Sequence, residues 1–321
     1  MATLDSAEQL TLVELAKRTN NSKIAEIAEV LNETNEILDD AVWVMANQPT
    51  SHVCTRRLSL PSGTWRKLNE GIGTEASKTV QVTEGMGMLE AYSKVDKALV
   101  DLAPDPKAFR FSEDKAFLEG LSQSLADVLI YGNADSAPEQ FNGMAKRYNT
   151  TADGSVISAG GSGSDTTSVW VVQWGENTVH MIYPKNSKTV GIEMNDLGEC
   201  TVLDADNKEF QAYRTHFKVN AGLAVRDPRS IKRIANIETS GASNTFSENH
   251  LITLLNELPY KGRGAVIYCN STIRTQMDIA AKDKSNVNYS SAEIWGKPVM
   301  TFRGVPVRKV DALLNTETAI P

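Results

Sequence analysis

The sequence has few of the residues on which disulfide bonding, metal binding and catalysis depend. Its 321 residues include three cysteines and four histidines. A sparse and odd set of cysteines is typical of reduced thiols in a cytosolic setting rather than of a disulfide framework. His52 and Cys54 have the spacing of half a metal site, but no second pair stands at ligand spacing. We therefore expect no disulfide, no metal and no cofactor.

Long apolar runs and an excess of positive charge are also missing. No run approaches the roughly 20 residues of a membrane-spanning helix. The N-terminus lacks a basic segment followed by an apolar core, so we expect no secretory signal and no membrane partner. The net charge of −7 argues against binding of nucleic acid through a basic surface. It is compatible with the wall of a container whose inner face must not adhere to DNA.

The common patterns of catalytic and nucleotide-binding sites are absent as well. No Gly-x-Ser-x-Gly motif occurs, and the histidines lie in unlike contexts. His180 and His216 fall in alternating strand patterns, which predicts surface positions on neighbouring strands. The Gly/Ser-rich segment 154–165 contains no lysine and precedes a predicted strand, whereas a phosphate-binding loop follows one and opens a helix. We expect a flexible loop there and no catalytic residue.

The stretch 58–96 is the most unusual part of the sequence. Two predicted β-arms enclose a polar segment, 65–78, that is far longer than a tight hairpin turn of about 2–5 residues. The returning arm alternates, which places Val80 and Val82 on one face, in phase with Met86 and Met88. A two-stranded ribbon by itself is only marginally stable in water. Because this one also carries Trp65 and Ile72 on its tip, we expect it to lie across another molecule.

Helical periodicity marks three further segments. One helix is expected through 10–15 and a second from Ser22 to Met45, either as surface helices of the main domain or as an arm that packs on a neighbouring subunit. A third is expected over 112–131, with Ser112 as its N-cap, and its length of about 30 Å would make it a spine for the fold. The apolar stripe of this spine helix comprises Phe117, Leu118, Leu121, Leu125 and Val128.

The remainder of the sequence reads as mixed α/β structure. A hairpin is predicted between 168–174 and 178–183, followed by strands at 200–203, 210–219 and 231–237. The last third predicts a helix from Ser247, a buried strand at 265–269, a helix from Ser271, and a hairpin of 297–301 with 305–310.

The order of these parts and of several short motifs resembles the major capsid proteins of tailed phages, with the Hong Kong 97-type fold, within the short-tailed (podovirus) subgroup. The match spans nearly the whole chain and rests on the ordered set of motifs. The residues that carry it are Leu60-Pro61, Trp65-Arg66, Leu68-Asn69-Glu70-Gly71, Thr79-Val80-Gln81-Val82, Tyr131-Gly132-Asn133, Gln140-Phe141-Asn142-Gly143-Met144, Ala221-Gly222-Leu223-Ala224-Val225-Arg226-Asp227-Pro228-Arg229 and Phe302-Arg303-Gly304-Val305-Pro306-Val307-Arg308.

The resemblance implies an α+β fold with four parts. Residues 1–55 would form an N-terminal arm and 56–96 an extended E-loop. Residues 97–138, with part of the C-terminal region, would form a P-domain around the spine helix. Residues 139–321 would build mainly the A-domain, with a return to the P-domain. Each E-loop would cover the P-domain of a neighbouring subunit. The expected intersubunit residues are Arg56, Arg57, Trp65, Arg66, Lys67, Glu70, Ile72, Glu75, Lys78 and Glu84.

The same resemblance implies partners. The chain itself would form the hexamers and pentamers of an icosahedral shell that encloses double-stranded DNA without sequence-specific binding. The segment before the E-loop is too short for a fused scaffold, which implies a separate scaffolding protein. A portal protein at one vertex and a decoration or cement protein complete the expected partners, with assembly in the cytoplasm of a bacterial host.

Two other classes of protein remain as alternatives. A cytosolic hydrolase would use 58–92 as a mobile flap and would depend on one histidine for activity. A receptor-binding or tail-fibre protein would contain trimeric fibre repeats, which the sequence does not.

Overall fold

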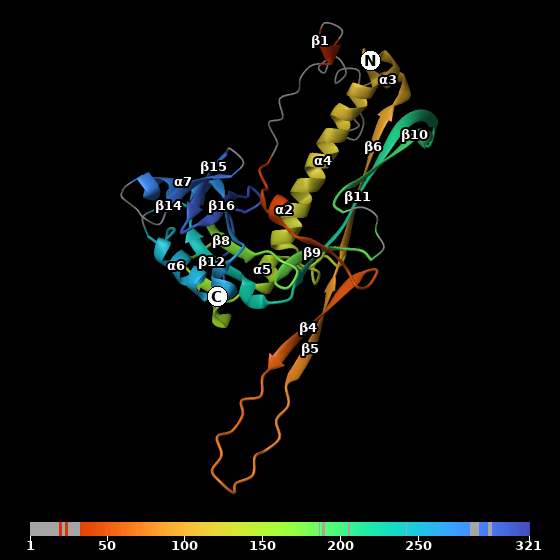
Figure 1. Ribbon diagram of the computed structural model, residues 1–321. Coiled ribbons are helices and arrows are strands. Elements are labelled where there is room, and N and C mark those ends of the chain that lie inside the picture. Colours follow the sequence, from red (N-terminus) through yellow and green to blue (C-terminus); the bar gives the residue numbers. More distant parts are fainter. Residues whose placement is uncertain are drawn as a thin grey trace. The chain divides into compact units, whose positions relative to one another are not determined.

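The computed structural model describes residues 19–20, 23–24 and 33–321, apart from 186, 188–189, 205, 242, 283–288 and 295–296. The chain divides into two compact units that are interleaved along the sequence. The first unit combines Met88–Leu125 and Lys188–Asn220 with the described residues before Thr34. The second unit combines Thr34–Gly87, Ala126–Ser187 and Ala221–Pro321. Figure 1 shows the elements in chain order.

The first unit pairs helices with a small antiparallel sheet. Strand β10 (Glu193–Leu203) pairs with β11 (Glu209–Val225) across the turn at 204–208, and β6 (Gly87–Asp96) also pairs with β11. Helix α3 (Lys97–Leu102) contributes Leu99 and Val100 to a buried cluster with Val95 and Phe109. Strands β1 (Thr19–Asn20) and β2 (Lys23–Ile24) form a separate antiparallel pair.

The spine helix is present but begins earlier than the sequence predicts. Helix α4 spans Pro106–Tyr131. The Asp105 carboxylate accepts the N–H groups of Lys107 and Ala108 at 3.1 Å each, which caps the helix well before the expected Ser112. Pro106 starts the helix, since proline is well tolerated in the first helical turn, where its missing N–H would have no partner.

The apolar stripe of α4 is only part of its buried surface. Leu121 and Leu125 are buried as predicted, whereas Phe117, Leu118 and Val128 are half-buried. Within the first unit, the ring of Phe117 stacks on Phe217 of β11 with centroids 5.6 Å apart. The last two turns also bury three residues outside that stripe, which are Ala126, Leu129 and Ile130. The last two turns of α4 therefore bury more of their surface than the predicted stripe.

The second unit contains a seven-stranded mixed sheet in the order β14-β15-β16-β13-β8-β12-β7. Its interior strand β8 is buried along its whole length and pairs antiparallel with both β12 and β13. The strand bounds are β7 Val156–Ser158, β8 Thr166–Gln173, β12 Ile231–Glu238, β13 Ala265–Cys269, β14 Tyr289–Ile294, β15 Lys297–Phe302 and β16 Val305–Lys309.

Two helices supply the remainder of the core of this sheet. Helix α6 (Glu248–Glu257) buries Leu251 and Leu254, and helix α7 (Ser271–Lys282) buries Ile273 and Met277, all in one cluster with Val169 of β8. The predicted helices, the buried strand at 265–269 and the hairpin of β15 with β16 are confirmed. The predicted loop 154–165 differs in one respect, because β7 lies inside it and pairs with β12.

Two predictions about strand pairing and helix length are wrong. The expected hairpin does not form, because β8 and β9 (Val179–Tyr183) belong to different sheets; β9 pairs with β11 and with β3 (Trp43–Met45). The expected helix from Ser22 to Met45 is replaced, in its described part, by β2, by the single helical turn α2 (Ile37–Asp40) and by β3. Pairing of β3 with β9 outweighs the helical periodicity. The helix expected through 10–15 lies outside the described residues.

A buried polar network holds the C-terminal segment in the second unit. The carboxylate of Glu317 lies 2.9 Å from the guanidinium of Arg233 on β12, and both side chains are almost fully buried. Ser168 on β8 and Tyr131 at the end of α4 donate hydrogen bonds to the same carboxylate. Because these donors come from separate elements, Glu317 joins the end of the chain to the centre of the sheet.

We predict that Glu317→Ala lowers the free energy of unfolding by about 3 to 5 kcal/mol, since it leaves the buried Arg233 without its counter-ion. Urea denaturation provides the measurement. Asp206→Ala is the control, because the pair of Asp206 with Lys208 is mostly exposed and should contribute less than about 1 kcal/mol. Equal effects of the two substitutions would contradict this role of the network.

Candidate functional site

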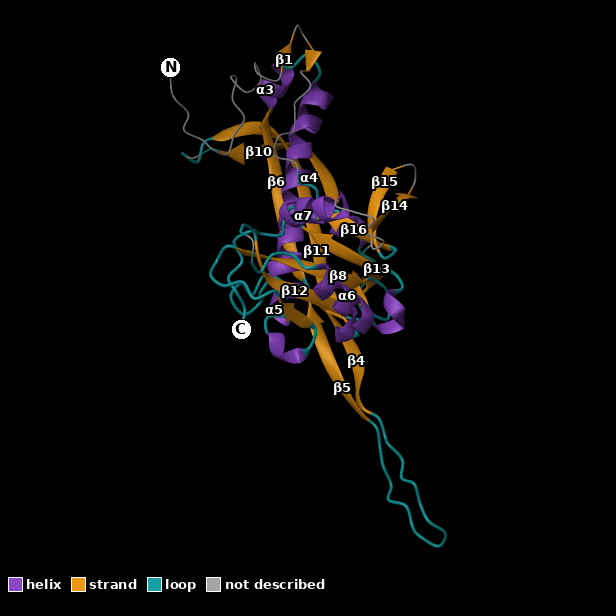
Figure 2. Ribbon diagram, turned by 90° about the vertical axis from the view of Figure 1, so that its left-hand side faces the viewer, coloured by secondary structure: helices purple, strands orange, loops and turns teal. Residues whose placement is uncertain are grey.

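The two-armed ribbon is the feature of the structure that has the least support from its own chain. Strands β4 (Ser51–Ser59) and β5 (Lys78–Gly85) pair antiparallel from Ser51 opposite Gly85 onward. They form a two-stranded sheet that no other described strand joins. Figures 1 and 2 show it extending from the body of its unit, with the loop 60–77 at its far end. We call 60–77 the tip and 51–56 with 82–85 the root.

The ribbon is shorter on its returning side than the stretch 58–96 implied. It ends at Gly85, and β6 starts at Gly87 as a separate strand that pairs with β11. Val80 and Val82 therefore share a face of the ribbon, whereas Met86 follows β5 and Met88 belongs to β6. The alternation of the sequence continues through this break, so the pattern alone could not locate it.

Apolar side chains on the tip lie in solvent, as predicted for Trp65 and Ile72. Trp65 is 103% exposed and Leu68 is 90% exposed. Leu58, Leu60 and Ile72 are exposed as well. Burying one such side chain contributes about 1.5–3 kcal/mol, so burial of the apolar side chains of the ribbon would favour association with another molecule.

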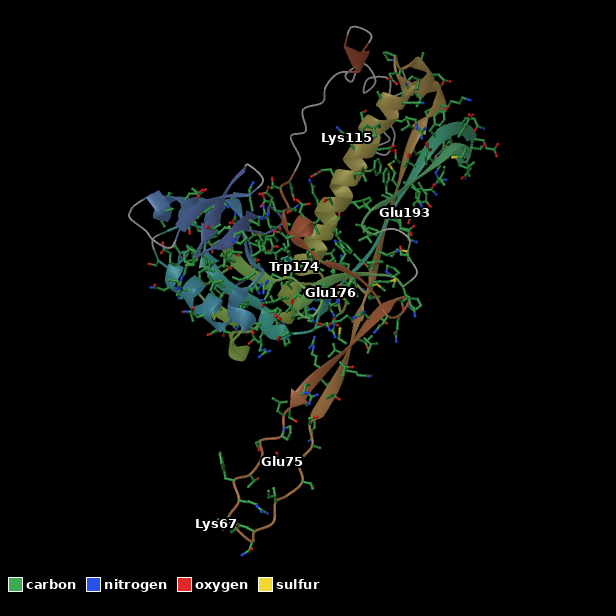
Figure 3. The ribbon with its side chains drawn as sticks, viewed as in Figure 1. Lys67, Glu75, Lys115, Trp174, Glu176 and Glu193 are labelled. Atoms are coloured by element: carbon green, nitrogen blue, oxygen red, sulfur yellow. The ribbon has the colours of Figure 1, made fainter. Side chains whose placement is uncertain are left out.

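The tip has local order despite this exposure. The carboxylate of Glu75 accepts the N–H of Ser62 at 2.7 Å and of Gly63 at 3.2 Å, which joins the two sides of the loop. These backbone hydrogen bonds, that of Gly63 first, lower the pKa of Glu75. Near the end of the tip, Glu70 accepts the N–H of Lys67 at 3.3 Å. Figure 3 labels Lys67 and Glu75 at these places.

Most of the predicted intersubunit residues are available for contact. The exposed ones that form no ion pair in the described part of the chain are Arg57, Arg66, Lys67, Glu70, Glu75 and Lys78. Arg56 and Glu84 differ from this set, because both lie at the root and are engaged within the chain.

Glu84 is an anchor of the ribbon rather than an exposed partner. It is 4% exposed, and Arg147 donates to its two oxygens at 2.9 and 2.7 Å in a bidentate pair. Arg147 also donates to the carbonyls of Asn142 and Leu223, and Arg56 donates to the carbonyl of Val225. The sequence did contain a signal for this burial, because Glu84 is in phase with the apolar face of Val80 and Val82.

A small apolar contact lies at the same root. Cys54 of β4 is buried against Ile182, Ala224 and Met86. His180 of β9 is 1% exposed, contrary to the surface position predicted for it, and neither of its ring nitrogens has a hydrogen-bond partner. The ring of His52 meets it edge-on with centroids 5.6 Å apart. The alternating pattern of β9 gave no signal that His180 is buried, because β9 is covered on both faces.

Burial disfavours the charged forms of His180, His52 and Cys54. Burial, followed by the nearby charge of His52, lowers the pKa of His180 to about 4. Burial also lowers the pKa of His52 and raises the pKa of the Cys54 thiol. No group of three or more potential ligands that could hold a metal occurs in the described part of the chain.

His216, the other histidine placed on a strand surface, lies as predicted. It is partly exposed on β11, 3.1 Å from the carboxylate of Glu90 on β6, and it stacks on Tyr92 with centroids 4.5 Å apart. It has the cross-strand surface role that the alternation of β11 indicates.

The long apolar segments expected of a membrane protein are not found either. Among the described residues, no helix combines the length and the apolar composition that a bilayer crossing requires.

Comparisons with known proteins give a consistent result. A family model described as major capsid protein GP7 matches residues 19–321. No curated protein matches the chain. A chain from the cryo-EM structure of bacteriophage Epsilon15 is 34% identical, with a TM-score of 0.73 and coverage of 100% of this chain and 99% of that one.

Two further solved structures are similar to this chain: the capsid of a native GTA particle and the SrpI encapsulin of Synechococcus elongatus PCC 7942. The GTA chain has a TM-score of 0.48 at 12% identity, with 68% of this chain and 95% of that chain covered. The encapsulin has a TM-score of 0.46 at 10% identity, with 74% and 99% covered.

We predict that Glu84→Gln loosens the root of the ribbon without changing its tip, because the half-buried guanidinium of Arg147 loses its counter-ion. Amide exchange at 51–56 should become about tenfold faster or more. The matched control is Glu75→Gln in the exposed tip, which should leave 51–56 unchanged. Unaltered exchange at the root in the Glu84 variant would show that the ion pair does not fix the ribbon.

We also predict a pH-dependent contribution from His180. The unfolded chain binds more protons than the folded chain between the ordinary pKa of 6.5 and the folded pKa of about 4. The free energy of unfolding should therefore fall as the pH is lowered through this range, by about 2 kcal/mol from pH 7 to pH 4.5. Urea denaturation of His180→Leu should show a fall in the free energy of unfolding between pH 7 and pH 4.5 that is smaller by this amount. An equal fall for the two proteins would contradict the prediction.

Proposed function

The chain belongs to the family of the major capsid protein GP7, and we propose that it assembles into an icosahedral shell in which each ribbon tip binds a neighbouring copy. It is a capsid shell protein with the α+β Hong Kong 97-type fold. The prediction made from the ordered motifs is confirmed to that extent.

The observation that carries the proposal is the full exposure of Trp65 and Leu68 on an anchored ribbon. A mobile loop could fold back on its own chain and hide these side chains. This one is held at its root by the pair of the buried Glu84 with the half-buried Arg147, at 2.7 Å, and hydrogen bonds to Glu75 join the two sides of its tip. A second copy supplies the missing apolar partner.

The proposed parts follow the expected division, with the ribbon redefined as 51–85. Residues before it form the arm, α4 is the spine of the P-domain, and the seven-stranded sheet with α6 and α7 forms most of the A-domain. Obligate interfaces of this kind typically bury more than about 2,000 Å². The exposed charges of the ribbon set its register on the neighbour more than they add affinity.

Hexamers and pentamers of the chain would enclose double-stranded DNA without reading its sequence. A separate scaffolding protein guides assembly in the bacterial cytoplasm, a portal protein occupies one vertex, and a decoration or cement protein binds the finished shell. Expansion from a procapsid occurs by rigid-body rotation of subunits with re-aiming of arm and ribbon. The shell withstands the internal pressure of its DNA through high barriers to subunit loss.

The alternative of a hydrolase with a flap at 58–92 gains no support. The end of that segment belongs to β6, which is paired in a sheet. His180 is buried without a hydrogen-bond partner, so it has no contact of the kind that a nucleophile and base require. We propose that the chain has a structural role and no catalytic one.

We predict that Trp65→Ala, or deletion of 72–78, gives a folded subunit that forms at least about tenfold fewer shells, since the loss of about 3 kcal/mol at each contact is repeated around the shell. Light scattering and negative-stain microscopy provide the measurement. Trp65→Phe is the control and should assemble, because it keeps an aromatic anchor. Normal particles from both Trp65→Ala and the deletion would defeat the proposed function.

A further inference from the structure

The Gly/Ser-rich segment 154–165 makes specific backbone contacts that neither nucleotide binding nor the ribbon accounts for. Ala159 donates its N–H to the carbonyl of Ala235 on β12, and Gly161 donates to the carbonyl of Asn236, each at 2.9 Å. A Cβ atom on Gly161 would lie 2.5 Å from the Asn236 carbonyl oxygen, so this close approach requires glycine. The segment is therefore fixed along β12.

The extended segment 317–321 lies against this loop and against the start of β8. Glu317 pairs with Thr166 in an antiparallel bridge: its N–H donates to the Thr166 carbonyl at 2.9 Å, and its carbonyl accepts the Thr166 hydroxyl at 2.8 Å. Ala319 donates its N–H to the Gly163 carbonyl at 2.9 Å. Figure 1 marks this end of the chain near β12. The segment is thus held through its backbone, as are peptides that add a strand to a sheet.

Asn236 binds both backbone groups of one residue of this segment. Its side-chain amide accepts the N–H of Ile320 at 2.9 Å and donates to the Ile320 carbonyl at 3.0 Å, as the backbone of a neighbouring strand would. A further bond to the Ser158 hydroxyl, at 3.0 Å, orients the amide. Asn236 itself has a φ of 59°, a left-handed conformation that asparagine tolerates. Beyond it, Thr151 donates its N–H and its hydroxyl to the Pro321 carbonyl at 3.0 Å each.

A buried charge adds selectivity for one side chain. The guanidinium of Arg233 is almost fully buried, lies 4.9 Å from the ring centroid of Trp170, and pairs with the Glu317 carboxylate at 2.9 Å. An uncharged side chain in the place of Glu317 would leave this cation without its counter-ion, which is strongly unfavourable. The residues that bind the segment form what we call the acceptor site: Thr151, Gly163, Thr166, Ser168, Arg233 and Asn236.

The acceptor site is built without a contribution from the segment. Its residues lie on β8, on β12 and in the loops beside them, and these two strands pair with each other. In contrast, 317–321 is joined to the rest of the chain through 314–316, which are exposed. A site that is already formed binds a peptide at a lower cost in conformational entropy.

We infer that the acceptor site is a peptide-binding site, and that 317–321 is its separable ligand rather than a fixed strand of the sheet. The site recognises an extended peptide with a glutamate for Arg233, followed three residues later by a residue whose backbone pairs with Asn236. It binds such a peptide from a separate molecule as well as from its own chain. Occupancy stabilises the second unit, because Arg233 then has its counter-ion. The site shares no residue with the ribbon, so it is tested on the unassembled subunit.

A cleavage and exchange experiment tests this site. A protease recognition sequence is inserted between Asn315 and Thr316, and the folded full-length chain is cut after purification. A fluorescent peptide of residues 315–321 is then added in excess, and its binding is followed by fluorescence anisotropy over a day. We expect saturable binding of one peptide per chain. The peptide with Glu317→Gln should bind at least about tenfold more weakly, because it lacks the charge that pairs with Arg233. The peptide with Thr318→Ala is the control and should bind unchanged, since that side chain is exposed.

A matched pair of substitutions tests the acceptor side. Asn236→Gly keeps the left-handed φ but removes both hydrogen bonds to Ile320, so the unmodified peptide should bind about tenfold more weakly to the cut chain. Asn244→Gly is the control, because Asn244 also has a left-handed φ, of 56°, but bonds to Glu238 and not to the segment. Its affinity for the peptide should not change.

Each outcome decides for or against the site. Failure of the labelled peptide to bind a cut chain that stays folded would show that 317–321 is a fixed part of the fold. Equal binding of the unmodified and Glu317→Gln peptides would contradict recognition through Arg233. If the cut chain unfolds after loss of its segment, urea denaturation is measured with increasing unmodified peptide. A midpoint that rises with peptide concentration supports the site, and a constant midpoint overturns it. None of these results alters the proposed role of the ribbon in assembly.

Discussion

The β-ribbon is anchored at its root and exposed at its tip, and the account of this structure depends on that difference. At the root, the buried carboxylate of Glu84 is held by Arg147 in a bidentate pair, and Cys54 packs in an apolar contact. At the tip, Trp65 and Leu68 are exposed and are covered by no apolar side chain of the described residues. Removing one partner of this ion pair would leave the other charge without its counter-ion, which costs free energy. The pair therefore holds the root of the ribbon in place. The apolar surface of its tip can then be buried only by another molecule.

Much of the remaining structure supports this arrangement. The strand that continues beyond the root of the ribbon, β6, pairs with β11, and β11 pairs with β9 and β10. Arg147 and Arg56, which contact Glu84, also donate hydrogen bonds to the backbone of β11. Arg147 donates to the carbonyl of Leu223 and Arg56 to the carbonyl of Val225. In the second unit the Glu317 network joins β8, β12 and the end of α4 to the C-terminal segment. Such a buried polar network fixes the positions of the elements that it joins, because a network that loses one partner leaves the other groups buried and unsatisfied.

The sequence predicted what depends on local pattern and on composition. The exposed tip, the helices α6 and α7, the buried strand β13 and the hairpin of β15 with β16 all have local signals, and the ordered motifs pointed to the correct family. Long-range pairing could not be predicted in the same way. The alternation of β8 and β9 fits a hairpin equally well, and only the partners β13 and β3 separate them into two sheets. Burial of His180 results from coverage of both faces of β9 by distant segments. Glu84 is the instructive case, because its phase with Val80 and Val82 indicated an inward position although its charge suggested an exposed one.

The most direct test of the central claim is amide exchange at 60–77, measured on the unassembled subunit over a range of concentrations and on finished shells. Because the tip is exposed and no described part of its own chain covers it, we expect rapid exchange in the dilute subunit and strong protection in the shell, with protection rising as copies associate. If the tip were already protected in a dilute monomer, and if this protection did not change with concentration or assembly, the ribbon would be complete within its own chain and the account would be wrong.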